Sequence, residues 1–251
     1  MRSSLVAGNW KMHGDSSRIQ QLLAELLKTL PAEPGIDIAV FPPSVYLSQV
    51  ASEMASSPVA VGAQNVSDQG AEGAFTGEVT AAMLADVGCQ YSLVGHSERR
   101  SLYGESSALV AAKAKVVLAA GLIPVVCVGE TEAQRDAGAT LDVISEQINA
   151  VFSALDSVEL KRIVVAYEPV WAIGTGKTAS PEQAQEVHAF IRALFAKKDQ
   201  KLASELRILY GGSVKASNAA KLFAQADIDG GLVGGASLNA QEFSAICRAA
   251  E

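Results

Sequence analysis

Short apolar runs rich in β-branched residues recur along the whole chain. They show little alternation with polar residues, which is typical of strands buried on both faces of a parallel sheet. The pattern predicts eight strands, at residues 5–9, 37–41, 59–63, 91–94, 123–128, 163–167, 207–210 and 231–233.

Between these runs, apolar residues return at steps of three and four, which is the pattern of a helix with one buried face. Residues 19–30 and 141–155 show it clearly. A further helix is predicted to begin after Ser180, because Ser180-Pro181-Glu182-Gln183 supplies an N-cap residue, a proline at the first helical position and a capping-box glutamine. Strands and helices therefore alternate along the chain.

Eight strand–helix units in 251 residues fit the size of a closed (β/α)8 barrel. The expected fold class is α/β, with eight parallel strands ringed by helices. A doubly wound open sheet produces the same alternation and stays open as the alternative. No linker or low-complexity stretch interrupts the series, so we expect a single domain over residues 1–251.

Composition narrows the classes of function. With 49% hydrophobic and 19% charged residues, the chain is too apolar to be disordered. A formal net charge of −7 argues against nucleic acid or an anionic membrane as the main partner, since both attract basic surfaces. The three cysteines cannot all pair and lack metal-type spacing, which indicates a reducing compartment. No apolar run reaches the roughly 18–20 residues of a membrane span and no signal-peptide pattern opens the chain, so we expect a cytoplasmic protein.

Polar residues and glycines follow most of the predicted strands. In a parallel α/β fold the carboxyl ends of the strands meet at one rim, where functional groups gather. The segments that follow the strands include Asn9-Trp10-Lys11, Gly95-His96-Ser97-Glu98-Arg99-Arg100, Gly129-Glu130, Glu168-Pro169, Gly211-Gly212-Ser213 and Gly234-Gly235. A lysine, a histidine and a carboxylate on one rim, beside two glycine-rich turns, indicate acid–base chemistry next to a phosphate-sized site.

Each of these residues also has a purely structural interpretation. Glu168 alone could cap a helix or pair with a lysine, and His96 alone is better interpreted as a hydrogen-bonded core histidine. Lys11 alone would be a solvated surface lysine. The functional interpretation is favoured because all of them fall at predicted strand ends.

The stretch after Glu168 contains glycines that resemble nucleotide-binding motifs. A Walker phosphate loop would need glycine at position 171, where Trp171 stands. Gly174-Thr175-Gly176 fits a loose dinucleotide fingerprint, but it begins well past the strand. Val170, Trp171 and Ile173 lie between a proline and a glycine and are predicted to be exposed. Exposed apolar residues in such a loop are instead typical of a lid, in which they pack only when it closes.

Other catalytic classes have little support. The three histidines lie far apart and none belongs to a metal-ligand cluster, so we expect no metal. There is no Gly-x-Ser-x-Gly motif for a serine nucleophile. Cys127 lies in an apolar strand and is predicted to pack in the core rather than to act as a thiolate.

Taken together, the motifs of the chain resemble the triosephosphate isomerase family. They occur in the family's order and span nearly the whole chain: Asn9-Trp10-Lys11-Met12, Gly95-His96-Ser97-Glu98-Arg99-Arg100, Ala166-Tyr167-Glu168-Pro169-Val170-Trp171-Ala172-Ile173-Gly174-Thr175-Gly176, Tyr210-Gly211-Gly212-Ser213-Val214 and Leu232-Val233-Gly234-Gly235-Ala236-Ser237. The resemblance implies a TIM barrel that interconverts dihydroxyacetone phosphate and D-glyceraldehyde 3-phosphate through an enediolate, in glycolysis and gluconeogenesis, without cofactor or metal.

The resemblance also implies a role for each catalytic residue. Glu168 would be the base that moves a proton between adjacent carbons. His96 would polarise the carbonyl as a neutral imidazole, with a pKa well below its usual ~6.5 because it starts a short helix. Lys11 would supply positive charge and Asn9 a hydrogen bond, both next to the substrate. Glu98 would position Lys11.

By the same resemblance, backbone N–H groups would bind the substrate phosphate and a lid would close over it. The phosphate-binding residues would be Gly174, Ser213, Gly234 and Gly235, beside Asn9 and Lys11. The lid would consist of Pro169, Val170, Trp171, Ala172, Ile173, Gly174, Thr175, Gly176 and Lys177, with Tyr210 and Ser213 as partners of its closed form.

A homodimer is implied by the resemblance alone. The loop of residues 64–78, with Thr76 at its tip, would insert into the neighbouring subunit. Glu78 and Arg99 would pair between subunits. Two other functions stay open: another barrel enzyme acting on a phosphorylated sugar or indole precursor, and a nucleotide- or phosphate-binding module that uses residues 174–178 without catalysis.

Overall fold

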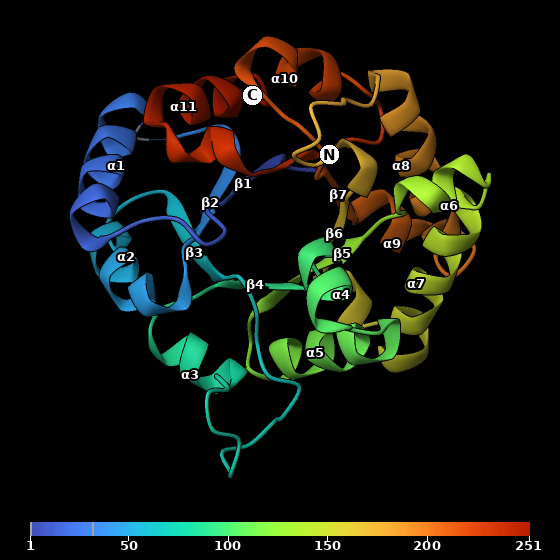
Figure 1. Cartoon of the computed structure of the whole chain (residues 1–251), viewed down its shortest axis with the longest axis horizontal. Coiled ribbons are helices and arrows are strands. Elements are labelled where there is room, and N and C mark those ends of the chain that lie inside the picture. Colours follow the sequence, from blue (N-terminus) through green and yellow to red (C-terminus); the bar gives the residue numbers. More distant parts are fainter. Residues whose placement is uncertain (1, 32) are drawn as a thin grey trace.

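A closed parallel barrel forms the centre of the molecule (Figure 1). The computed structural model describes residues 2–31 and 33–251. Its strands are β1 (Leu5–Asn9), β2 (Asp37–Phe41), β3 (Val59–Ala63), β4 (Tyr91–Val94), β5 (Ile123–Val128), β6 (Val164–Tyr167), β7 (Arg207–Tyr210) and β8 (Gly230–Val233). Each strand pairs in parallel with the next, and β8 pairs with β1. The predicted barrel is confirmed, and the open-sheet alternative is wrong.

Helices surround the barrel on its outside (Figure 1). They are α1 (Ser16–Thr29), α2 (Leu47–Met54), α3 (Ala81–Asp86), α4 (Ser97–Tyr103), α5 (Ser107–Ala119), α6 (Glu132–Asp136), α7 (Thr140–Ala154), α8 (Pro181–Ala196), α9 (Gln200–Glu205), α10 (Ala216–Phe223) and α11 (Ala240–Arg248). Short 3-10 turns add η1 (Ser44–Tyr46), η2 (Glu159–Arg162), η3 (Val170–Ala172) and η4 (Gly235–Leu238). The predicted capping box at the start of α8 is confirmed, because Ser180 and Gln183 accept each other's backbone N–H.

Apolar side chains form two layers, one inside the barrel and one between the barrel and its helices. Cys127 belongs to the inner layer and is fully buried, which confirms the prediction that it packs in the core. Burial raises the pKa of its thiol well above the ordinary value. Cys89 and Cys247 are buried in the outer layer, and burial raises the pKa of the Cys89 thiol to about 11.

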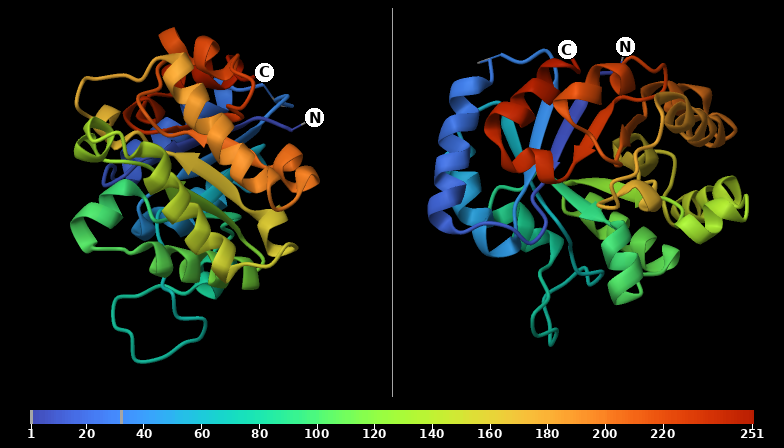
Figure 2. Two further views of the ribbon diagram at one scale, coloured as in Figure 1. Left: turned by 90° about the vertical axis from the view of Figure 1, so that its right-hand side faces the viewer. Right: turned by 45° about the horizontal axis from the view of Figure 1, so that its top comes forward.

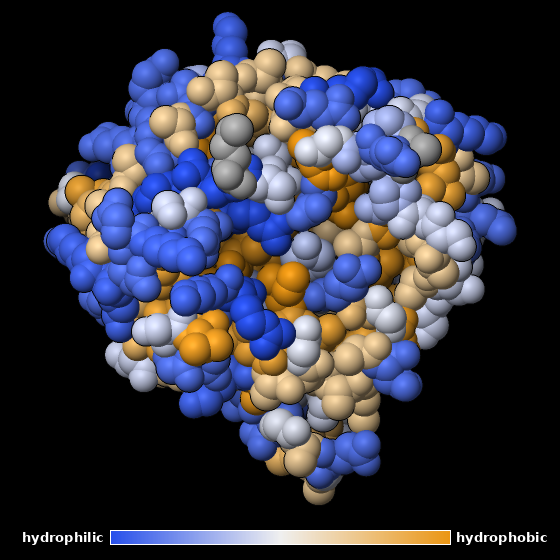
Figure 3. Space-filling view, turned by 180° about the vertical axis from the view of Figure 1, so that it is seen from behind, coloured by the Kyte–Doolittle hydropathy of each residue, from blue (hydrophilic) through white to orange (hydrophobic). Residues whose placement is uncertain are grey.

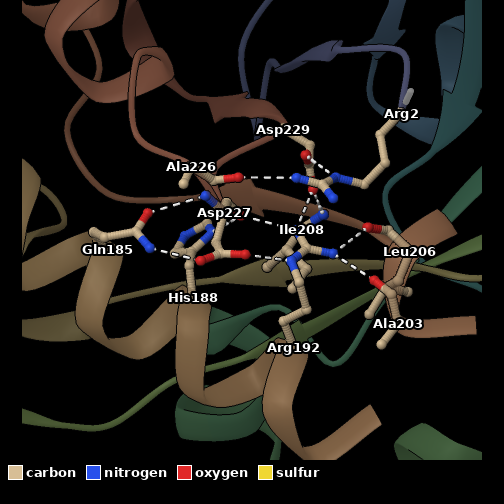
Figure 4. Close-up of polar contacts among 10 residues, drawn as sticks. All are labelled: Arg2, Gln185, His188, Arg192, Ala203, Leu206, Ile208, Ala226, Asp227 and Asp229. Carbon is tan, nitrogen blue, oxygen red and sulfur yellow. Dashed lines mark hydrogen bonds and ion pairs between the residues drawn. The ribbon is translucent and has the colours of Figure 1, made fainter. Parts of the chain in front are cut away.

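A polar cluster joins β7 and β8 where their own ladder is short (Figure 4). Asp229, just before β8, accepts the backbone N–H of Ile208 at 2.9 Å. Arg192 of α8 donates to both Asp227 and Asp229 and to two backbone carbonyls before β7. Arg2 also pairs with Asp229, at 2.6 Å, so the N-terminal segment is attached to the same polar cluster between β7 and β8.

We expect Arg192→Met to lower the free energy of unfolding by about 3 kcal/mol, because it leaves two largely buried carboxylates with too few donors. Urea denaturation at a fixed protein concentration measures the change. Lys201→Met is the control, since the Lys201–Glu205 pair is exposed and its loss is worth about 0.5 kcal/mol or less. Equal effects of the two substitutions would contradict the role given to this cluster.

The chain between β3 and α3 projects from the body of the molecule (Figure 2). Residues 70–78 of this loop are all exposed, and the same projection is visible at the lower edge of the surface seen from behind (Figure 3). Among the helices of the described residues, none combines the length and the apolar character required to cross a membrane.

Candidate active site

One cavity of about 450 Å³ brings the predicted site residues together. Its wall includes Asn9, Lys11, His96, Glu168, Gly174, Ser213, Gly234 and Gly235. These residues come from the ends of β1, β4, β6, β7 and β8 and from residues 169–177, the predicted lid. The convergence follows from the fold, because the carboxyl ends of all parallel strands point to one rim.

Glu168 is buried and is held by three donors. Its Oε2 accepts the backbone N–H of Ser97 at 2.8 Å, and its Oε1 lies 3.1 Å from Ser97 Oγ and 3.0 Å from His96 Nε2. Burial alone would raise the pKa of Glu168, but His96 and Ser97 outweigh it and the pKa is lowered. Glu168 is therefore an ionised carboxylate at neutral pH. Ser97 was not predicted as a site residue, although its place after the fourth strand is a usable signal.

The prediction of a lowered pKa for His96 is wrong for this conformation. Burial lowers the pKa of His96, but the charge and hydrogen bond of Glu168 outweigh burial and raise it. The contact between the two side chains joins separate strands, so a prediction from the helix start alone missed it. A second contact favours the neutral ring: the backbone N–H of Glu98 donates to Nδ1 at 3.2 Å, which places the proton of the neutral imidazole on Nε2.

These contacts predict how the His96 ring titrates. In the unliganded protein, a raised pKa means that the imidazolium persists to a pH above the ordinary value of 6.5. In Glu168→Gln the raising charge is gone while burial remains, so the pKa of His96 should fall below 6.5. Nitrogen-15 NMR of the ring between pH 5 and 8 distinguishes the two forms. A ring that titrates identically in both proteins would contradict this assignment.

Lys11 adopts a left-handed backbone conformation, with φ of 50°, the only positive φ at a non-glycine residue in the described part of the chain. Such a conformation costs about 1–3 kcal/mol and persists where neighbours enforce it. Here Asn9 Oδ1 accepts the Lys11 N–H at 3.0 Å, and Gln64 Nε2 donates to the Lys11 carbonyl at 2.8 Å. The Lys11 ammonium pairs with Glu98, which is not part of the wall of the cavity described above.

Two glycines after β7 have no room for a side chain. A Cβ on Gly211 would lie 2.9 Å from Glu168 Cγ, and a Cβ on Gly212 would lie 2.2 Å from Tyr210 Oη. Any larger residue would therefore displace the Glu168 carboxylate or the buried Tyr210. Ser213 follows directly, and Gly234 and Gly235 continue the same wall of the cavity, so exposed backbone can approach an anion closely here.

The predicted lid is attached to a buried carboxylate, Glu130, for which no role was predicted from the sequence. Glu130 follows β5, and its Oε1 accepts from Trp171 Nε1 at 2.9 Å and from Tyr167 Oη at 3.1 Å. Arg135 of α6 lies over the Trp171 ring, 4.4 Å from its centre. Trp171 is consequently half-buried, as are Val170 and Ile173, so the prediction that these three are exposed is wrong.

Comparison with known proteins identifies the family. A model of the family described as triosephosphate isomerase matches residues 4–250. The chain belongs to the triosephosphate isomerase family. It is 62% identical over 250 residues to the triosephosphate isomerase of Thiobacillus denitrificans, covering 100% of this chain and 99% of the relative. The corresponding values are 59% over 251 residues for that of Ectopseudomonas mendocina and 56% over 250 residues for that of Pseudomonas aeruginosa, with the same coverage.

A second cavity, of about 440 Å³, lies on the other side of Lys11, His96 and Glu98. We call it the interface cavity, after the predicted homodimer. Its rim carries strongly exposed apolar side chains, which mark interaction sites: Met12 is 93% exposed, Leu102 72% and Tyr103 69%. Glu78 and Arg99 both line it, but Arg99 pairs within the chain with Glu105 at 2.5 Å. The pairing of Arg99 with Glu78 between subunits stays a prediction.

Proposed function

We propose that this protein, through a single catalytic domain of residues 1–251, interconverts dihydroxyacetone phosphate and D-glyceraldehyde 3-phosphate in glycolysis and gluconeogenesis. One observation carries the proposal. An ionised, buried carboxylate, an imidazole and an ammonium line one cavity together with the glycine turns that follow β7 and β8. Neither a metal nor a cofactor takes part in the proposed reaction.

The reaction needs one base that serves two adjacent carbons. Glu168 removes a proton from the carbon next to the substrate carbonyl, and the electron pair moves to the carbonyl oxygen, which gives an enediolate. Glu168 then returns the proton to the neighbouring carbon, while the hydroxyl proton passes to the former carbonyl oxygen and a new carbonyl forms on the carbon that lost its proton. To reach the substrate, the carboxylate leaves Ser97 and turns into the cavity that it already lines.

Stabilisation of the enediolate lowers the barrier, because a carbon acid next to a carbonyl is otherwise too weak for a carboxylate base. His96 donates from Nε2, the nitrogen that the Glu98 backbone contact leaves protonated. Once Glu168 turns toward the substrate, the charge that raises the pKa of His96 moves away and the neutral ring is favoured. Lys11 adds positive charge, oriented by Glu98, and Asn9 adds a hydrogen-bond donor.

The phosphate is held by backbone N–H groups of Gly174, Ser213, Gly234 and Gly235, which lie on the same wall of the cavity. Closure of the lid brings Gly174 over the anion and excludes water from the enediolate. The contacts of Trp171 with Glu130 are broken in this motion, so Glu130 stabilises the open lid. Tyr210 and Ser213 are the expected partners of the closed lid.

A cytoplasmic homodimer is part of the proposal. The exposed loop of residues 64–78, with Thr76 at its tip, enters the interface cavity of a second copy. The loop is narrow, since residues 70–77 include three glycines and one charged side chain, Glu72. The strongly exposed apolar rim of the cavity supports this assembly, because it would be covered. The expected partners are thus triose phosphates and a second copy of the chain, not nucleic acid or membrane.

The function is tested by a coupled assay with each of the two triose phosphates, combined with exchange of substrate hydrogen in deuterium oxide. The proposal predicts turnover in both directions, deuterium at the carbon that gains the proton, and loss of both in Glu168→Gln. Tight binding of inorganic phosphate without turnover or exchange would instead indicate a phosphate-binding module.

A further inference from the structure

The side chain of Arg100 connects the ends of two strands beneath the active site. Arg100 lies on α4, next to α5 (Figure 1), and Nε donates to the Gly95 carbonyl at 2.9 Å. Its Nη2 donates to the Cys127 carbonyl at 3.1 Å, and its Nη1 to Ser107 Oγ at 3.3 Å. The guanidinium is therefore bound on three sides.

These contacts begin where the ladder between β4 and β5 ends. The last pair of that ladder is Val94 with Val126. Gly95 and Cys127 are the next residues on the two strands, and both give their carbonyls to Arg100. The planar guanidinium extends the connection between the strands by one step, which the single ammonium of a lysine cannot do with the same geometry.

Each of the two strand ends carries one member of the catalytic pair. Gly95 has a φ of 69°, and this turn directs His96 and Ser97 toward Glu168. The end of β5 supports Glu168 itself, because the Glu168 N–H donates to the Val128 carbonyl at 2.7 Å. A Cβ on Gly129 would lie 1.8 Å from the Glu168 carbonyl oxygen, so the two backbones are in close contact.

We propose that Arg100 is a positioning residue of the isomerase, whose guanidinium sets the separation between His96 and Glu168 by tying together the strand ends that carry them. The inference rests on the proposed function. Arg100 is absent from the wall of the catalytic cavity, so it acts through the two strand ends rather than on the substrate. It borders a separate cavity of about 410 Å³ on the outer side of Glu168, which is lined also by Ser101 and Gln134.

The first test compares kcat with KM. Arg100→Lys keeps the positive charge but loses the planar guanidinium that binds both carbonyls. The resulting misplacement of His96 and Glu168 should lower kcat about 10–100-fold. KM and the inhibition constant of inorganic phosphate should stay within about twofold of the parent values, since the phosphate-binding wall is untouched. Arg162→Lys is the control, because the exposed Arg162 also donates from its guanidinium to a backbone carbonyl, that of Leu118, away from the site. It should leave kcat unchanged.

The second test is chemical rescue. In Arg100→Ala, millimolar guanidinium chloride can enter through the neighbouring cavity and should restore part of the lost kcat. Tetramethylammonium chloride, which has no N–H donor, should not. If Arg100→Ala does not fold, the lysine variant decides alone.

Two results would overturn the inference. One is a kcat of Arg100→Lys within twofold of the parent value. The other is a fall in kcat that matches the loss of folded protein in thermal unfolding, with no rescue. Failure of the proposed function looks different, because the parent protein itself would then not interconvert the triose phosphates.

Discussion

Glu168→Asp should lower kcat by about 10²-fold while KM changes little, because the shorter side chain withdraws the carboxylate by about 1 Å from the reacting carbons. The backbone cannot advance to compensate. The Glu168 N–H is bound to the Val128 carbonyl at 2.7 Å, and Gly211 packs against Glu168 Cγ from another side. The phosphate-binding wall is unchanged, so the binding of substrate is retained. Steady-state kinetics in both directions measure the two constants separately.

Glu182→Asp is the matched control for this prediction. The substitution shortens the side chain by the same one methylene group, in the first turn of α8, where Glu182 is exposed to solvent. Its kcat should equal that of the parent protein. A near-native kcat for Glu168→Asp would remove Glu168 from the proposed mechanism, whatever the control shows.

Thr76→Glu should give a monomer whose activity is lower by at least about 10²-fold. In the proposed dimer, Thr76 enters the interface cavity of the partner, where a new carboxylate finds no free cation. Lys11 is already paired with Glu98, and Arg99 with Glu105. An unpaired buried charge costs several kcal/mol, which would prevent assembly. Without the partner's loop packed against them, the strained Lys11 and the neighbouring His96 are held less firmly. Their side chains then depart from the geometry that the reaction requires.

Analytical ultracentrifugation and specific activity, measured together over a dilution series, test both parts of this prediction. Thr76→Val is the control, because it has nearly the same shape without a charge, and it should remain dimeric and active. A Thr76→Glu protein that is monomeric and fully active would show that each barrel works alone. A dimeric and active Thr76→Glu protein would show that Thr76 does not enter the cavity.

Much of the fold and of the candidate site could be predicted because the signals are local. A strand buried on both faces needs a continuous apolar run, and six of the eight strands have the predicted ends. β6 begins one residue later than predicted. β8 begins one residue earlier, at Gly230, which has a φ of 120° and no side chain that could contribute to an apolar pattern. Site residues were found by their place after strands, and all the catalytic and phosphate-binding candidates except Glu98 line one cavity.

The sequence by itself determined the ends of six strands, the start of α8 and which residues reach the active rim, since the apolar period and the capping residues act within a few positions. Tertiary structure alone decided the closure of β8 onto β1, the contact of Glu168 with His96 and Ser97, and the attachment of Trp171 to Glu130. These contacts join residues from 41 to more than 200 positions apart. Their strength depends on burial and on charges that meet only when the barrel closes, which is why the pKa of His96 departs from its helix-based expectation.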